Sequence, residues 1–443
     1  MKRRQRGSRA RPHGGCTMMA SSRRLPTLPL DVMYAVLQDA PKPTLLACSV
    51  VSRTWREAAV PHLFASIEIA RSAGNCSDIN KELLDMYPHL TRHIRRLRIV
   101  YHKPRWSILP SDEYPIVDSD LLLIFSRRLP CLKEIYLRSL WISIAQPQSP
   151  DVLTTYRLNK LTLVDCGAED RPISSADLHV LLQLANTVQV DMVDIKMQSV
   201  ERQADNLVTP ALLRLLDWRS LRLQIQWGQL NDSDRDLVFW LCDDLRVAFA
   251  PRSLTSLDMG CRTLVHVDDS LRKVGQFLVH ACSRTMQHLS FPVTIESDLA
   301  SSYPSEQANF WRVVHLHSFT SIETFELTLM VPTPGHRPPR APLGTVCVAI
   351  IALLPRSLRQ VTISLRDVKE ASQIKSKKML DLGTLDDALD ARAPVLEKVR
   401  VVFRGLGQWY LVEFAMAAMK VMSKCRRRGI LDIVRWDYDV SPM

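Results

Sequence analysis

The feature that most constrains the fold of this chain is a six-residue pattern, apolar-x-x-apolar-x-apolar, that recurs along most of its 443 residues. Side chains of an extended strand alternate between two faces, so the last two apolar positions of each copy point to the same side. Successive copies are 26 to 38 residues apart, a spacing typical of chains that stack one strand and one return segment per repeat. The ten copies are Ile94/Leu97/Ile99, Leu132/Ile135/Leu137, Leu158/Leu161/Leu163, Val190/Val193/Ile195, Trp218/Leu221/Leu223, Leu254/Leu257/Met259, Met286/Leu289/Phe291, Ile322/Phe325/Leu327, Leu358/Val361/Ile363 and Leu396/Val399/Val401.

Helix-starting residues stand before apolar stretches between several of these strands. We therefore expect an α/β fold in which parallel strands lie inside and helices lie outside. An ordinary α/β domain with a parallel sheet alternates the same elements and stays open as an alternative. The fixed spacing and the lack of a glycine-rich turn after any strand argue against it. The expected helix starts are Asp118-Ser119, Ser174-Ser175, Thr209-Pro210 and Asp268-Asp269.

The recurring pattern resembles the strand segment of leucine-rich repeats, L-x-x-L-x-L, in a long and irregular form. The copy that begins at Leu158 also places Cys166 where that family has Asn or Cys. The resemblance implies a solenoid over residues 71–443, with its strands along an inner curve.

A separate helical segment precedes the repeats. Pro29 suits the first position of a helix, and the prolines at 41 and 43 interrupt it. Trp55 is followed by two small residues, Ala58 and Ala59, so we expect its indole to be an internal anchor of this segment. Three short helices can bury only a small core, and part of their apolar surface should need a partner.

The order of these residues, from Leu28 to Phe64, resembles an F-box. A Leu-Pro pair opens the first helix, and a Val-Ser-Arg-x-Trp-Arg signature runs from Val51 to Arg56. The resemblance implies a three-helix F-box over residues 25–70 that binds a Skp-family adaptor. A helical cap on the larger domain, without an adaptor, is the alternative. The implied adaptor-binding residues are Leu28, Pro29, Leu30, Val32, Met33, Val36, Leu37, Leu45, Leu46 and Val50.

Together the two resemblances imply a substrate receptor of an SCF-type (Skp–cullin–F-box) ubiquitin ligase. Such a receptor is not an enzyme and needs no cofactor. It reaches a cullin–RING core through the adaptor and holds an unidentified protein target. Two alternatives stay open: an F-box scaffold that does not direct ubiquitination, and a nuclear nucleic-acid-binding protein that acts through the basic N-terminus.

The target is expected on the inner curve, because the position between the last two apolar residues of each copy points away from the core. In this row positive and negative residues are nearly balanced, which disfavours nucleic acid and is closer to a protein-binding surface. The implied target-binding residues are Arg98, Tyr136, Thr162, Asp194, Arg222, Asp258, Ser290, Glu326, Thr362 and Arg400.

The net charge of +12 is mostly local. Residues 1–24 form a basic tail with eight Lys and Arg residues and no acidic residue, and the rest of the chain carries +4. We expect this tail to be disordered, and it is either a nuclear-import signal, a nucleic-acid contact or a solvated segment. A further alternative is that translation begins at Met18 or Met19, which would remove the first basic run.

Ten scattered cysteines and the lack of a secretory signal predict a cytoplasmic or nuclear protein with reduced thiols. No apolar run reaches the eighteen or so residues that a membrane span needs, so we expect no membrane association. No phosphate-binding glycine motif and no catalytic-triad motif is present. His315 and His317 could place two imidazoles on one face of a strand, but two histidines without further ligands do not predict a metal site.

Overall fold

The computed structural model describes residues 28–71, 84–85, 87–101, 115–143, 158–167, 172–185, 187–197, 218–224, 253–260, 268–282, 284–293, 315–331, 342–366, 368–392, 394–404 and 411–436. The chain divides into two compact units, Met1–Leu63 and Phe64–Met443. Ser66–Arg71 is the first strand of the second unit. The second unit therefore starts seven residues before position 71, where the sequence placed the beginning of the repeats.

The first unit contains the helices α1 (Leu30–Leu37), α2 (Lys42–Val51) and α3 (Arg53–Leu63). Pro43 lies in the first turn of α2, where a helix tolerates proline. Ser52 has extended backbone angles that separate α2 from α3, and its Oγ accepts a hydrogen bond from the Trp55 N–H at 3.2 Å. The helices enclose a small core made of Met33, Leu37, Leu45, Ala58 and Ala59.

The second unit is built on a parallel sheet of twelve strands. The strand order follows the chain order without a reversal, unlike the order of a doubly wound sheet. The predicted α/β architecture with a parallel sheet is therefore confirmed. A separate pair, β3 (Ile116–Val117) and β5 (Trp141–Ile142), is also parallel. The strands of the large sheet are β1 (Ser66–Arg71), β2 (Arg96–Tyr101), β4 (Glu134–Arg138), β6 (Lys160–Val164), β7 (Gln189–Val193), β8 (Ser220–Gln224), β9 (Ser256–Gly260), β10 (His288–Val293), β11 (Thr324–Met330), β12 (Gln360–Arg366), β13 (Lys398–Arg404) and β14 (Leu431–Trp436).

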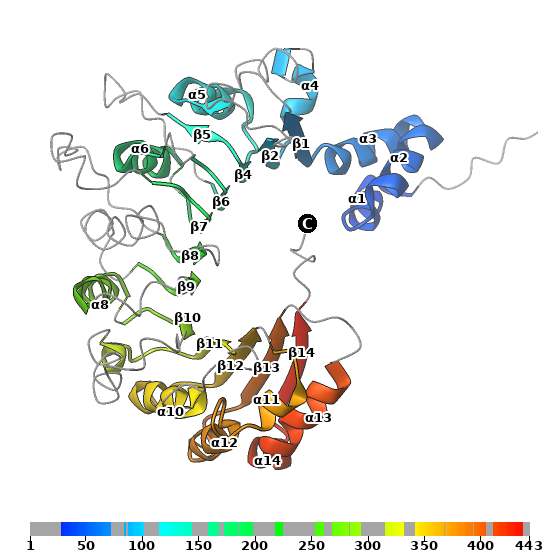
Figure 1. The fold of residues 1–443 in the computed structure, drawn as a ribbon. Coiled ribbons are helices and arrows are strands. Elements are labelled where there is room, and N and C mark those ends of the chain that lie inside the picture. Colours follow the sequence, from blue (N-terminus) through cyan, green and yellow to red (C-terminus); the bar gives the residue numbers. More distant parts are fainter. Residues whose placement is uncertain are drawn as a thin grey trace, which may run out of the picture. The chain divides into compact units, whose positions relative to one another are not determined.

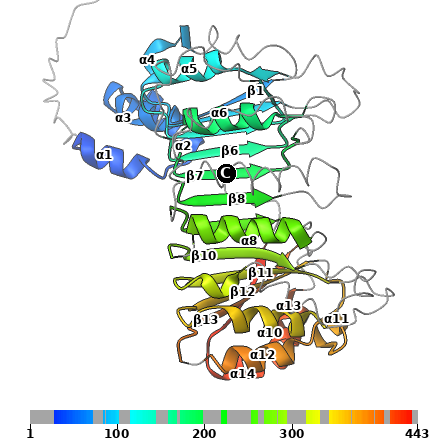
Figure 2. The ribbon, with the colours of Figure 1, turned by 90° about the vertical axis from the view of Figure 1, so that its left-hand side faces the viewer.

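Helices cover one face of this sheet. Figure 1 shows α5, α6, α8, α10 and α12 on the outer side of the strands, and Figure 2 shows α6, α8 and α10 in front of them. The opposite face of the sheet, which we call the open face, carries none of these five helices (Figure 1). The helical elements are α4 (Pro88–Thr91), α5 (Ser119–Arg128), α6 (Ser175–Ala185), α8 (Asp268–Cys282), the short 3-10 helix η8 (Leu316–Ser318), α10 (Leu343–Leu353), α11 (Ala371–Lys375), α12 (Leu382–Asp390), α13 (Leu411–Val421) and α14 (Ser423–Arg427).

Three of the four predicted helix starts are confirmed. The Asp118 carboxylate accepts the Leu121 N–H at 2.7 Å at the start of α5. The Ser174 hydroxyl accepts the Asp177 N–H at 2.9 Å before α6, and α8 begins at Asp268. Each cap satisfies an N–H group that the first turn leaves without a partner in the helix. The fourth start, Thr209-Pro210, lies outside the described residues.

Consecutive strands begin with the same backbone contact. The two N–H groups at the start of one strand both donate to a single carbonyl oxygen before the preceding strand. The Gln287 and His288 N–H groups donate to Thr255 O at 2.8 and 3.0 Å, and those of Glu323 and Thr324 donate to Gln287 O at 3.0 Å. This contact recurs at each strand from β2 to β13 except β7, where the Val188 and Gln189 N–H groups donate to two different carbonyls, those of Leu158 and Asn159. The stacking of strands therefore repeats even where the sequence between them varies.

The apolar positions of the repeat form one core between the sheet and the helices. Nine of the ten predicted copies pair in the predicted register, from Leu97 opposite Ile135 to Val361 opposite Val399. The structure also adds a strand at each end of the sheet. Ile67 of β1 pairs with Leu97, and Leu431 of β14 pairs with Val399.

The fourth predicted copy was placed three residues too late. Leu161 pairs with Val190, so Thr187 and not Val190 takes the first position of the pattern. Thr187 is buried, and its hydroxyl donates to Gln189 O at 2.9 Å. This hydrogen bond lets a polar side chain occupy a position that is apolar in the other copies.

Candidate protein-binding surfaces

The first candidate surface is apolar and belongs to the helical unit. Eleven large apolar side chains are exposed in the described part of the chain, and seven of them lie between residues 28 and 51. Val32 and Val36 share one side of α1, and Leu46 and Val50 share one side of α2, because residues four apart lie on the same helix face. The exposed fractions of Val36 and Val50 are 62% and 76%. The seven residues are Leu28, Leu30, Val32, Val36, Leu46, Val50 and Val51.

This distribution corrects part of the predicted adaptor-binding set. Met33, Leu37 and Leu45 were expected at the adaptor surface, but their side chains form the core of the helical unit. Periodicity marked one apolar stripe on α1, and it could not tell the side that packs against α3 from the side that stays exposed. Pro29 is exposed, as are the other six predicted residues Leu28, Leu30, Val32, Val36, Leu46 and Val50.

Trp55 packs against this small core but is only partly buried, whereas the sequence predicted an internal anchor. We expect Trp55→Ala to cost about 2 kcal/mol, less than the 3–5 kcal/mol typical of a fully buried aromatic. Limited proteolysis of the full chain should show faster cleavage within residues 28–63, with Trp55→Phe protected almost as well as wild type. Unchanged protection of the alanine variant would show that the indole adds nothing to this core.

The second candidate surface is the open face of the sheet. Nine of the ten predicted target-binding residues lie in one row across the sheet, in which each residue pairs with the next one on the neighbouring strand. We call it the Arg98 row. Asp194 is the exception, because the shifted register places Asp191 in the row. Asp194 follows the end of β7 with a left-handed backbone (φ 55°). The row has twelve members: Glu68, Arg98, Tyr136, Thr162, Asp191, Arg222, Asp258, Ser290, Glu326, Thr362, Arg400 and Asp432.

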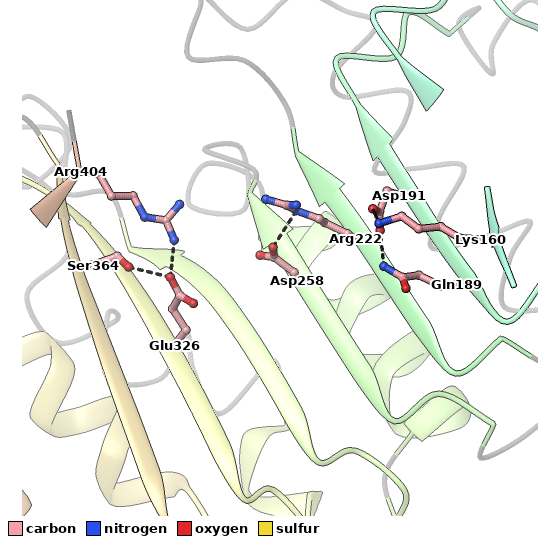
Figure 3. A network of polar contacts seen from close by, with 8 residues as sticks. All are labelled: Lys160, Gln189, Asp191, Arg222, Asp258, Glu326, Ser364 and Arg404. Carbon is pink, nitrogen blue, oxygen red and sulfur yellow. Dashed lines mark hydrogen bonds and ion pairs between the residues drawn. The ribbon is translucent and has the colours of Figure 1, made fainter. Parts of the chain in front are cut away.

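Charged side chains on the open face pair across neighbouring strands. Figure 3 shows two of these ion pairs. Arg222 Nε lies 3.1 Å from Asp258 Oδ2, and Lys160 Nζ lies 2.5 Å from Asp191 Oδ2. A third group spans three strands: Glu326 Oε1 accepts hydrogen bonds from Ser364 Oγ and Arg404 Nη2, both at 2.6 Å (Figure 3).

The pairing continues at both ends of the sheet. Arg98 Nε lies 3.3 Å from Glu68, and its guanidinium carbon lies 4.6 Å from the centre of the Tyr136 ring, in a cation–π contact. At the other end, Asp432 Oδ2 binds both Lys398 Nζ at 3.0 Å and Arg400 Nε at 3.1 Å.

The pKa values of two carboxylates of the open face, Asp258 and Asp432, are shifted in opposite directions. Partial burial raises the pKa of Asp258, with the charge of Arg222 acting against the rise and that of Glu326 adding to it. The hydrogen bond from Lys398 lowers the pKa of Asp432, and the bond from Arg400 acts in the same direction. Asp432 is therefore held as an anion by two cations, whereas burial favours the neutral form of Asp258.

Among the described strand residues, the charges of the open face do not balance once three further rows are included: the two that flank the Arg98 row, and the next one, which holds Arg366 and Arg404. All six acidic side chains have an ion-pair partner on another strand: Glu68, Glu134, Asp191, Asp258, Glu326 and Asp432. Nine basic side chains occupy the same face of the strands: Arg96, Arg98, Arg138, Lys160, Arg222, Arg366, Lys398, Arg400 and Arg404. The described strands therefore carry three positive charges in excess on this face, whereas the ten predicted positions alone are nearly balanced.

The described residues offer little for metal or thiol chemistry. Among them, no group of three or more His, Cys, Asp or Glu side chains is arranged to hold a metal ion. His315 is the N-cap of the 3-10 helix η8 and His317 lies within this helix, so neither is on a strand, which corrects their predicted placement. Burial raises the pKa of Cys166 and of Cys347 to about 12, so neither thiol ionises readily near neutral pH.

The chain matches no protein-family model and no curated protein. Within the part of the chain that the structure describes, no helix has the length and apolar character needed to cross a membrane.

Proposed function

We propose that this protein is the substrate receptor of an SCF-type ubiquitin ligase, with an F-box at residues 28–63 and a leucine-rich-repeat-like solenoid after it. The observation that carries the proposal is the concentration of exposed apolar side chains on the first two of three short helices whose sequence resembles an F-box. Leaving seven large apolar groups in water is costly, at roughly 1.5–3 kcal/mol for each Leu or Val side chain that a partner would bury. An adaptor that covers them explains why they are there.

The parallel sheet supports the second half of the proposal. Its sequential strand order and the repeated contact between consecutive strands are typical of a stacked-repeat protein. The open face of this sheet is long and polar, and such a face suits a protein target. The receptor would perform no bond chemistry itself. It would hold the target near the ubiquitin-charged enzyme, because proximity makes a bimolecular transfer effectively unimolecular.

The proposal predicts that the full chain, expressed with a Skp-family adaptor and a cullin–RING core, purifies as one complex. Replacing the eight Lys and Arg residues of the tail with Gln should leave this complex intact, because that tail lacks an apolar run with which to bind the adaptor. Failure of the wild-type chain to retain the adaptor would contradict the proposal. Dependence of the complex on the tail charges would contradict it too.

A second measurement distinguishes a ubiquitin-ligase receptor from an F-box scaffold that does not direct ubiquitination. If the protein directs ubiquitination, proteins captured by the wild-type chain should carry ubiquitin in a reaction with the full ligase. They should lose it when the cullin is omitted. Captured proteins that stay unmodified under both conditions would favour a scaffold.

A further inference from the structure

The excess positive charge of the open face is greatest at its C-terminal end. On strands β11 to β14 the basic residues Arg366, Lys398, Arg400 and Arg404 stand against two acidic residues, Glu326 and Asp432. The middle strands β8 to β10 carry one of each, Arg222 and Asp258. Two of the three excess positive charges therefore lie within four adjacent strands.

Both acidic residues of this region already form ion pairs with its basic residues. Asp432 accepts from both Lys398 and Arg400, and those two side chains remain 40% and 37% exposed. Glu326 accepts from Arg404, which is only 13% exposed. Lys398 and Arg400 are therefore more accessible than Arg404, and they share a single internal carboxylate.

A guanidinium or ammonium group that shares its carboxylate keeps N–H donors for a second anion. Lys398 and Arg400 lie two residues apart on β13 and point to the same face, so they are separated by about 6.6 Å along the strand. An extended chain lying along this strand repeats at the same spacing, so its alternate residues could present a carboxylate to each of them. A polyphosphate fits less well, because its uninterrupted charges would also lie beside the carboxylates of this face, whereas an acidic peptide can place neutral residues there.

We propose that strands β11 to β14 of the open face bind an acidic segment of a protein target, with Lys398 and Arg400 as the main contacts. This inference deepens the proposed function and rests on it. The Glu326 carboxylate opposes binding, because it adds a negative charge beside the site and occupies Arg404.

The test is a titration of the full chain with a short fluorescein-labelled peptide of alternating Glu and Gly, followed by fluorescence anisotropy at low salt. All proteins carry Gln in place of the eight basic tail residues, so that the tail does not bind the probe. Lys398→Gln with Arg400→Gln should weaken binding about five- to tenfold, since exposed ion pairs are individually modest. Glu326→Gln should strengthen binding about two- to fivefold.

The matched control is Arg96→Gln with Arg138→Gln, which removes the same charge from the opposite end of the same face. It should change binding less than twofold. Added salt should weaken wild-type binding. Circular dichroism and thermal melting of each variant report whether the sheet stays folded.

Three outcomes would overturn the inference: equal weakening by both double variants, no gain from Glu326→Gln in a folded protein, or tighter binding of an oligothymidylate than of the acidic peptide. The adaptor complex is measured in parallel. A chain that retains the adaptor but fails the peptide test contradicts this inference alone, whereas loss of the adaptor from the wild-type chain contradicts the proposed function.

Discussion

A protein carrying Val36→Asp and Val50→Asp is expected to bind a Skp-family adaptor at least about a hundredfold more weakly than the wild-type chain. Each valine that a partner buries contributes roughly 1.5–3 kcal/mol, and each new carboxylate would have to be desolvated without a partner. Both side chains are exposed and absent from the core of the helical unit, so the substitutions should spare its folding. Titration calorimetry of the purified full chain with the adaptor measures the change.

The control places the same two charges elsewhere on the same helices. Gln38, just after α1, and Thr44 in α2 are exposed and project well away from the valine stripes. Gln38→Asp with Thr44→Asp should leave the affinity within about twofold to threefold. Equal loss in both variants would indicate a general charge effect, and undiminished binding of the valine variant would exclude these stripes as the adaptor surface. Testing Val36→Asp and Val50→Asp singly shows whether α1 and α2 both contribute.

Replacing Gly344 with Ala is expected to lower the free energy of unfolding of the second unit, Phe64–Met443, by about 1–3 kcal/mol. Gly344 lies in the first turn of α10, where its N–H donates to Leu380 O at 2.6 Å and the Leu343 N–H donates to Met379 O at 2.9 Å. The carbonyls of Met379 and Leu380 thus accept hydrogen bonds from N–H groups that have no partner within the first turn of the helix. A Cβ on Gly344 would collide with the carbonyl oxygens of Leu380 and Asp381, which are backbone atoms and cannot rotate away.

Gly383 supplies the comparison, because it lies in the neighbouring helix α12 and has room. A Cβ there would have its nearest contacts at 3.9 Å from Asp381 Oδ1 and 4.0 Å from Val421 Cγ1. Gly383→Ala should therefore be neutral, or stabilise by about 0.5–1 kcal/mol through helix propensity. Urea unfolding of both variants, followed by circular dichroism, measures the difference. A Gly344→Ala protein as stable as Gly383→Ala would show that the segment 379–381 shifts at little cost.

The strand pattern was predictable from sequence because its spacing is local. The apolar positions around Leu161, Phe325 and Val399 pair in the register that the pattern predicts. The copy near Val190 failed because Thr187, a polar residue, fills an apolar position and satisfies its hydroxyl on the backbone. The sequence did not predict the outer strands β1 and β14, because β1 lies mostly in the segment 25–70 that was assigned to the F-box, and because β14 shows only the last two positions of the pattern.

The sequence by itself determined the positions of most strands, the helix starts at Asp118, Ser174 and Asp268, and the apolar character of the N-terminal helices, because each depends on residues a few positions apart. Only the tertiary structure decided which apolar side chains of those helices stay exposed, since burial depends on which elements pack together. It alone also decided the charge of the open face. Glu326 and Arg404 are 78 residues apart in the chain and meet only because parallel strands stack side by side. Such contacts follow from the register of the whole sheet, and no local pattern encodes them.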